Sequence, residues 1–165
     1  MKKYVFREYD PQYPTFFSLE AKKLEEILGM EVRVEHVGST AVPGLGGKGI
    51  IDVVIGVPKE KMWDTKKILE KHYVFREQWS TPERLYFIQD YPYQGSTRRV
   101  HIHLTEEEGE IWRELVGFRD YLLAHPAALK KYVMIKKEAV KVALGEGEKY
   151  RKHKDAFIKD ILDKL

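Results

Sequence analysis

The chain has 165 residues, with 29 basic residues against 26 acidic ones, and a net charge of +3. This length favours one domain over residues 1–165, and so balanced a charge does not predict a nucleic-acid partner. The lack of cysteine excludes disulfides and thiolate metal sites. Neither a membrane span nor a signal-peptide core is evident, so we expect a cytoplasmic protein without a membrane partner, and its oligomeric state stays open.

Hydrophobic periodicity and turn residues predict an α+β chain. The expected elements, in chain order, are a helix at 16–30, a strand at 31–38, a Gly/Pro-rich loop at 38–49, a strand at 50–57, a helix at 58–72, strands at 73–79, 84–90 and 98–105, and helices at 107–124, 126–144 and 147–164. The gaps between the last three strands are short enough for antiparallel hairpins. One strand–helix unit, a run of antiparallel strands and a helical tail favour α+β over a doubly wound sheet.

Asp52 interrupts the apolar strand "IIDVVIGV". Strand alternation places Ile51 and Val53 on one face and Asp52 on the other. Because an unpaired buried carboxylate is costly, we expect a cation, a set of donors or a metal beside it. Two interpretations stay open: an aspartate that caps the neighbouring loop through backbone amides, or a functional carboxylate.

The strand "RRVHIHL" places His101 and His103 on one face. Two imidazoles at this spacing can bind one metal ion or flank one anion. Taken alone, a pair of histidines on a half-exposed sheet face is equally consistent with the pattern. The functional interpretation requires the strands that carry Asp52 and the two histidines to be near neighbours.

Gly38 and Ser39 follow a strand directly, and a turn with exposed amides and a hydroxyl suits a phosphate tail. Lys48 adds a cation to the same loop. The loop matches neither a P-loop nor a dinucleotide fingerprint. Glycine-rich loops also connect elements without binding anything, so the pattern alone leaves that alternative open.

The segment "EHVGSTAVPGLGGKGIIDVVIGV", with "HIHL" and "FRDYLLAHPAALKKYVMIKK" downstream, resembles the GrpB-like family of the nucleotidyltransferase (polymerase β-like) superfamily. The resemblance covers most of the chain. It implies an α+β nucleotidyltransferase-like mixed sheet flanked by helices, with a helical C-terminal tail. In that superfamily the turn matched by Gly38 and Ser39, here followed by Thr40, holds nucleotide phosphates, and Asp52 matches the first metal-binding aspartate.

The chain departs from the superfamily pattern at two positions. The second aspartate is Val54, and His101 and His103 stand where a third carboxylate is expected. This donor set shifts the preference from Mg²⁺ toward Mn²⁺ or Zn²⁺. The metal ligands implied are Asp52, His101, His103 and Glu35.

The resemblance implies a metal-dependent nucleotidyltransferase-like protein that acts on or binds a nucleotide or another phosphate-containing small molecule. Asp52 would hold a divalent metal (Mg, Mn or Zn), and Lys48 or Arg119 would stabilise charge in the transition state. One alternative is a catalytically inactive binding module. The other is a metal-dependent phosphoester hydrolase that uses Asp52 and the two histidines.

Three further side chains have competing roles. Arg119 can clamp a substrate phosphate or pair with a sheet carboxylate, and the second role is favoured. His36 lies on the apolar side of its strand, so a core or capping role is expected. Lys136 and Tyr132 lie one helical turn apart and either reach the same cleft or serve packing and surface.

Overall fold

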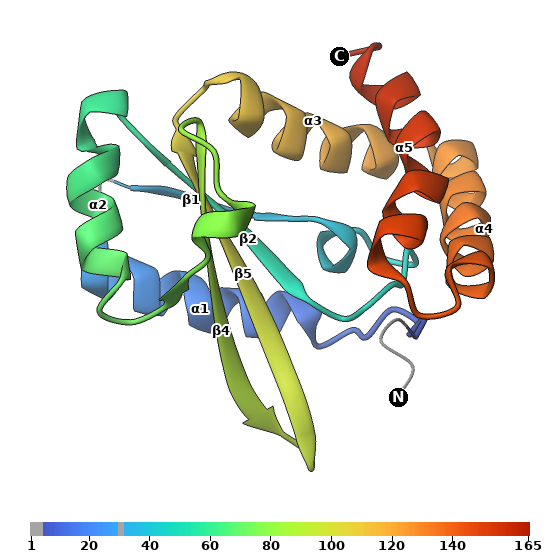
Figure 1. Ribbon diagram of the computed structural model, residues 1–165, viewed down its shortest axis with the longest axis horizontal. Coiled ribbons are helices and arrows are strands. Elements are labelled where there is room, and N and C mark those ends of the chain that lie inside the picture. Colours follow the sequence, from blue (N-terminus) through green and yellow to red (C-terminus); the bar gives the residue numbers. More distant parts are fainter. Residues whose placement is uncertain (1–4, 30–31) are drawn as a thin grey trace.

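A five-stranded mixed sheet flanked by helices forms the centre of the molecule (Figure 1). The computed structural model describes residues 5–29 and 32–165. The strand order is β1-β2-β5-β4-β3, in which β2 and β5 are parallel and the other neighbours antiparallel. The elements are α1 (Tyr13–Leu28), β1 (Arg33–Val37), β2 (Ile51–Val57), α2 (Met62–Leu69), β3 (Val74–Phe75), β4 (Arg84–Tyr93), β5 (Ser96–Glu106), α3 (Glu110–Ala124), α4 (Pro126–Ala143) and α5 (Gly147–Leu162). The expected α+β class is confirmed.

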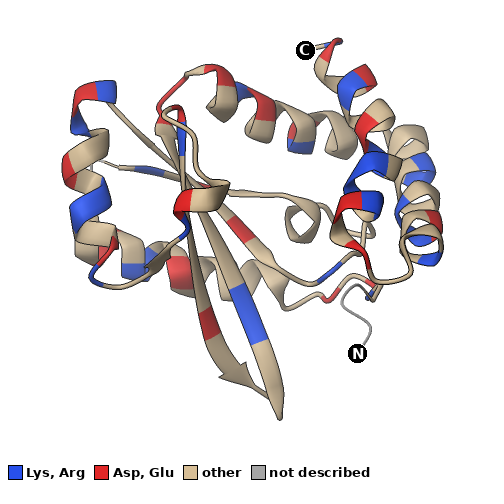
Figure 2. Cartoon of the chain, in the orientation of Figure 1, with Lys and Arg blue, Asp and Glu red and all other residues tan. Residues whose placement is uncertain are grey.

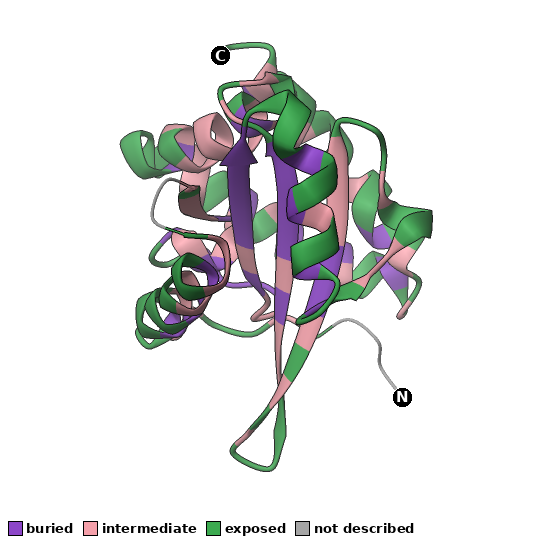
Figure 3. Cartoon of the chain, turned by 90° about the vertical axis from the view of Figure 1, so that its left-hand side faces the viewer, coloured by how far each residue is buried: buried purple, intermediate pink, exposed green. Residues whose placement is uncertain are grey.

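The observed elements follow the expected ones closely, with two clear differences. The strand expected at 73–79 is confined to β3, and Glu77–Trp79 forms a 3-10 helix instead. The second difference lies in β4 and β5. Residues 91–95, expected as a connecting gap, mostly continue the two strands, which pair as far as Tyr93 and Ser96. The turn is only Gln94-Gly95, both with positive φ (47° and 73°), as hairpin turns that match the strand twist require. The hairpin therefore projects beyond the body of the sheet, and its tip is exposed (Figure 3). Met30 and Glu31, the end of the expected first helix and the start of the expected first strand, lie outside the described residues.

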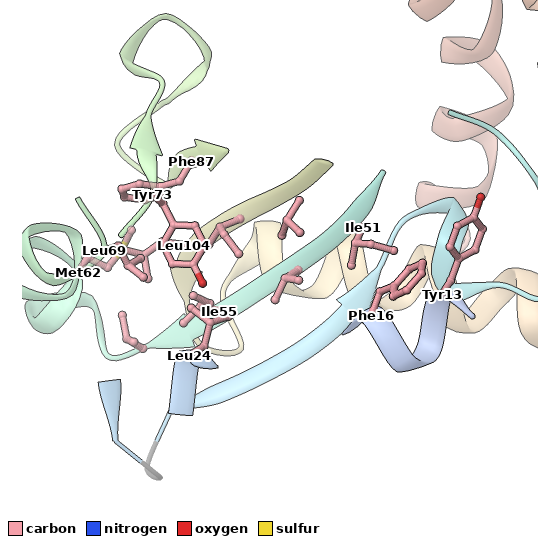
Figure 4. Packing of buried hydrophobic residues seen from close by; sticks show 14 residues of the cluster. Tyr13, Phe16, Leu24, Ile51, Ile55, Met62, Leu69, Tyr73, Phe87 and Leu104 are labelled. Carbon is pink, nitrogen blue, oxygen red and sulfur yellow. The ribbon is translucent and has the colours of Figure 1, made fainter. Parts of the chain in front are cut away.

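One face of the sheet packs against α1 and α2. Ile51, Val53 and Ile55 of β2 point to this face and are fully buried, as their alternation predicts. Figure 4 shows this core, in which Leu24 of α1 and Leu69 of α2 close over the strands. Because this face is filled by side chains of both helices, β2 can carry polar chemistry only on its other face.

The opposite face is covered in part by α3. Trp112 packs over Val37 and Val54, both fully buried. Gly56 lies under the same indole, since a Cβ there would stand 2.8 Å from the ring. This cover fixes α3 against the second half of β2, while Asp52 occupies the start of the strand on the same face.

The C-terminal helices hold the glycine-rich loop that precedes β2. Val42 and Leu45 of the loop form a buried cluster with Leu122 of α3, Tyr132 of α4 and Ile161 of α5. The loop, which includes a short 3-10 helix at Ser39–Ala41, is thus tied to the helical tail (Figure 1). In the described ranges, no helix has both the length and the apolar composition needed to cross a bilayer.

Candidate functional site

Strand pairing brings together the carboxylate and the two imidazoles. The parallel register sets Asp52 beside His101 and Val54 beside His103. Asp52 Oδ1 lies 3.1 Å from His103 Nε2 and 3.4 Å from His101 Nδ1. The three side chains are mostly buried, with Asp52 retaining 22% exposure. The convergence depends on β2 and β5 being direct neighbours, which local patterns alone do not fix.

Tyr86 of β4 completes this cluster, and no motif in the sequence pointed to it. Its hydroxyl shares a hydrogen bond of 2.5 Å with His101 Nδ1, and its ring packs edge-on against His103 at 4.9 Å. Burial, with Asp52 nearby, raises the pKa of Tyr86 above its ordinary value. Only the β4–β5 register, which pairs Tyr86 with His103, places this tyrosine in the site.

Asp52 is held as a carboxylate. Burial would raise its pKa, but hydrogen bonding and charge interaction with His101 and His103 outweigh burial and lower the pKa well below the ordinary aspartate range. On the far side of its ring, His103 Nδ1 is buried and has no hydrogen-bond partner among the described residues. The cluster therefore presents an ionised acid with imidazole partners, consistent with a functional carboxylate rather than one capped only by loop amides.

The Gly38-Ser39 turn passes directly over this carboxylate. Gly38 adopts φ 73° and ψ −170°, a conformation that is essentially restricted to glycine. A Cβ on Gly38 would lie 2.5 Å from Asp52 Oδ2. The glycine thus permits close contact between the turn and the site.

We expect the Gly38→Ala substitution to lower the free energy of unfolding by about 2 kcal/mol, because alanine is strained at this backbone conformation. It should also displace the Asp52 carboxylate, since the new methyl group meets it. Urea denaturation followed by circular dichroism measures the loss. Gly95→Ala at the exposed hairpin turn is the control. Gly95 also has a positive φ, but a Cβ added there meets nothing within 4 Å. Equal losses in both variants would show that the contact with Asp52 is unimportant.

Lys136 of α4 reaches the same turn from the helical tail. The side chain is buried, at 4% exposure, and its Nζ donates a 2.7 Å hydrogen bond to the Gly46 carbonyl. A Cβ on Gly47 would collide with Lys136 Nζ and stand 2.9 Å from Ser39 Oγ. The buried amine and the serine hydroxyl therefore lie close to each other, on the side of Gly47 where a Cβ would stand. The burial of Lys136 favours a role in the site over the surface role that was the alternative.

Two more lysines lie near Lys136, one in the loop before β2 and one in α5. Lys48 and Lys154 lie over the ring of Tyr150, at 5.0 and 4.2 Å from its centroid. Figure 2 shows basic segments of α4 and α5 beside the loop that precedes β2. Lys154 carried no sequence signal, because it belongs to a helix rich in charged residues. We refer to Lys48, Lys136 and Lys154 as the lysine cluster.

The lysine cluster is electrostatically strained. Burial, together with the charges of Lys154 and Lys48, lowers the pKa of Lys136 to about 7, although Asp52 acts in the opposite direction. Burial and Lys48 lower the pKa of Lys154 to about 8. In the described part of the chain, neither Lys136 nor Lys154 forms an ion pair with a carboxylate. An anion bound beside these amines would relieve the repulsion among them.

Thr40, expected to help bind phosphate, lies in the same turn as Ser39, but its hydroxyl makes two other hydrogen bonds. It is buried, and its hydroxyl hydrogen-bonds His36 Nε2 at 2.9 Å and the Ile50 carbonyl at 3.1 Å. His36 stacks on Phe17 of α1 at 4.7 Å, and burial lowers its pKa to about 4. The core role expected for His36 is confirmed. The Thr40 hydroxyl is fully engaged in holding the loop, so we do not include it among the phosphate-binding groups.

Arg119 and Glu35 pair with each other. Arg119 Nη1 donates to Glu35 Oε2 at 2.7 Å and to the His36 carbonyl at 2.8 Å, while its Nε donates to Asp120. The favoured structural role of Arg119 is confirmed. This ion pair joins α3 to β1. It engages Arg119, the expected phosphate clamp, and Glu35, the fourth expected metal ligand. Neither is part of the site described below.

The donor set does not fit a resident metal ion. Val54, which the sequence resemblance would match to a second metal-binding aspartate, is buried beneath Trp112. Asp52 already accepts its hydrogen bonds from the imidazoles, and His101 Nδ1 is shared with Tyr86. No group of three or more His, Asp or Glu side chains in residues 5–29 and 32–165 is arranged to hold a metal. We therefore derive no reaction step through a resident metal.

Comparisons with known proteins agree on one family. The family model described as GrpB protein matches residues 4–164. A glutamate-rich protein GrpB of Alkalihalophilus pseudofirmus is 27% identical, over 95% of this chain and 92% of the relative. A UPF0157 protein of Halalkalibacterium halodurans is 28% identical, over 94% of this chain and 78% of the relative. The crystal structure of conserved protein GrpB from Enterococcus faecalis superposes with a TM-score of 0.82 at 30% identity, covering 97% and 96% of the two chains.

Proposed function

This chain belongs to the GrpB family, and from that premise we propose that its lysine cluster binds the phosphate groups of a nucleotide. The observation that carries the proposal is the buried amine of Lys136, set against Ser39 and Gly47 without a carboxylate partner in the described residues. A buried amine near two other amines favours the binding of an anion, because the negative charge of the anion offsets the repulsion among them. The likeness of the Gly38-Ser39 turn and Asp52 to the nucleotidyltransferase pattern supports a nucleotide as the anion.

The Asp52 cluster supports a second candidate function, nucleotidyl transfer. In this scheme the lysine cluster neutralises the triphosphate, and His101, held at Nδ1 by Asp52 and Tyr86, uses its Nε2 as general base. The acceptor hydroxyl gives its proton to the imidazole, its oxygen bonds to the α-phosphorus, and the bond to the pyrophosphate leaving group breaks. With water in place of the acceptor hydroxyl, the same steps hydrolyse the nucleotide, which is the reaction of the phosphoester hydrolase alternative.

The binding proposal is tested by calorimetric titration of ATP, CTP and GTP into the wild-type protein and into Lys136→Met. We expect at least one nucleotide to bind, and Lys136→Met to weaken its binding about tenfold or more, because one charge-assisted contact contributes roughly 1.5–3 kcal/mol. Methionine keeps most of the side-chain volume. Lys137→Met is the matched control, since this neighbour on α4 is about half exposed and pairs with Glu8.

Lys137→Met should stay within twofold of the wild type. Absence of binding by all three nucleotides, or equal weakening in both variants, would contradict the proposal. Incubation of the wild-type protein with each nucleotide, followed by mass spectrometry, separates the outcomes. Pyrophosphate with a nucleotidylated acceptor indicates transfer, hydrolysed nucleotide indicates the hydrolase, and unchanged bound nucleotide indicates a binding module.

A further inference from the structure

A separate cavity lies next to the N-terminal segment, on the sheet face that carries α1. Its volume is about 320 Å³, within the range of small-molecule sites. Its walls come from the segment before α1, the first turn of α1, Gly49 and the outer half of the β4–β5 hairpin. Gly49 stands two residues after Gly47, which lies beside Lys136, and Arg7 exchanges two backbone hydrogen bonds with Gly47. The cavity is thus close to the proposed nucleotide site but has different walls.

Two guanidinium groups line this cavity without carboxylate partners. Arg7 and Arg98 form no ion pair within the described ranges. The two acids in the wall are engaged elsewhere: Glu8 pairs with Lys137 at 3.4 Å, and Asp10 accepts the backbone N–H of Gln12 at 2.9 Å. Arg98 Nε is buried and lacks a hydrogen-bond partner among these residues. A ligand in the cavity would therefore have to bind the terminal nitrogens of Arg98, because its Nε is covered by the protein.

Aromatic rings hold the Arg98 guanidinium in place. Its central carbon lies 4.3 Å from the centroid of the Phe16 ring and 5.9 Å from that of Tyr93. The two rings pack edge to face at 5.0 Å. Stacking on a ring engages the face of a guanidinium and leaves its in-plane N–H groups able to donate to a planar or tetrahedral oxyanion. The cavity therefore combines oriented donors with an apolar wall.

We propose that this cavity is a second ligand site, which binds a small organic oxyanion, a carboxylate or a phosphate monoester, attached to a planar or apolar body. Arg98 and Arg7 bind the oxyanion, and Phe16, Tyr13 and Tyr93 contact the body. The burial of Tyr13 and Phe16 and the edge-to-face pair fix the shape of the wall before a ligand arrives. This site is independent of the nucleotide proposal, because none of its wall residues belongs to the lysine cluster or the Asp52 cluster.

Phenyl phosphate, benzoate and inorganic phosphate are suitable probes, titrated into the folded full-length protein by calorimetry. We expect phenyl phosphate or benzoate to bind, and Arg98→Met and Arg7→Met each to weaken that binding tenfold or more. Whichever organic probe binds more tightly identifies the oxyanion, and weaker binding of inorganic phosphate demonstrates the contribution of the apolar wall. Arg99→Met is the matched control, since Arg99 is the next residue on β5 and instead pairs with Asp90 at 2.7 and 2.8 Å.

Arg99→Met should leave probe binding within twofold of the wild type, and nucleotide affinity should stay within twofold in Arg98→Met. The proposal is overturned if neither organic probe binds at millimolar concentration, or if Arg99→Met weakens binding as much as Arg98→Met. It is also overturned if probe binding is lost in Lys136→Met but kept in Arg98→Met, because the probe then occupies the lysine cluster. Crystals soaked with the probe that show only ordered water at Arg98 would overturn it as well.

Discussion

Val54→Asp is expected to destabilise the protein by about 3–5 kcal/mol rather than to restore a metal site, because the new carboxylate would be buried without a partner. Val54 has no exposed surface and lies with Val37 beneath Trp112. In this sheet, the second acid of the superfamily pattern would meet an indole and a valine instead of a cation. Urea denaturation at pH 7, with and without Mn²⁺, measures the effect.

Val54→Thr provides the control, since threonine has nearly the same volume and shape and only replaces one methyl group by a hydroxyl. Val54→Thr should lower the free energy of unfolding clearly less than Val54→Asp does. The aspartate's penalty should also shrink on acidification, because burial raises the pKa of a carboxyl and its neutral form is tolerated better. Recovery of stability on adding Mn²⁺ would contradict our conclusion that this position is closed to metal.

Asp52→Asn is expected to lower the free energy of unfolding by about 3 kcal/mol at pH 7, since it weakens two contacts to a charged group, each contributing roughly 1.5–3 kcal/mol. The wild-type carboxylate has a pKa below that of the unfolded chain. Its contribution is therefore fully present above about pH 4 and is lost as the pH falls through the lower folded value. Unfolding free energies from pH 7 to pH 2 should show the difference between the two proteins shrinking at the acid end.

Asp90→Asn is the comparison variant, because Asp90 pairs with Arg99 on the exposed hairpin and its loss should cost less than 1 kcal/mol. Transfer activity, if the wild type shows it, should be lost in Asp52→Asn and kept in Asp90→Asn. A constant stability difference across the acid range would show that the low pKa of Asp52 does not contribute to folding. Unchanged activity would remove Asp52 from the reaction.

The local patterns of the sequence were sufficient to predict most of the elements, but not the whole of the site. Alternation in "IIDVVIGV" correctly assigned the apolar face of β2, because one buried face imposes a period of two on the sequence. The hairpin turn lies within the expected connection, but that connection is shorter than expected, since Pro92 and Tyr93 form strand where turn residues were expected. Proline is compatible with an edge region such as this projecting hairpin.

The site itself depends on contacts between distant parts of the chain. Asp52 and the histidines could be proposed together, but only the parallel pairing of β2 with β5 brings them within hydrogen-bond reach. Tyr86 and Lys154 have no local signature, because a strand tyrosine and a helical lysine are common on any surface. Their roles arise from burial and from neighbours supplied by tertiary packing.

The packing of the glycine-rich loop against the last helices has a consequence for biosynthesis. Ser39 and Asp52 are synthesised well before Lys136 and Lys154, which lie far downstream in the sequence. A nascent chain therefore cannot assemble the lysine cluster beside Ser39 until α4 and α5 have left the ribosome. An anion bound by this cluster would link the loop before β2 to these two helices, so its binding should oppose their detachment from the sheet.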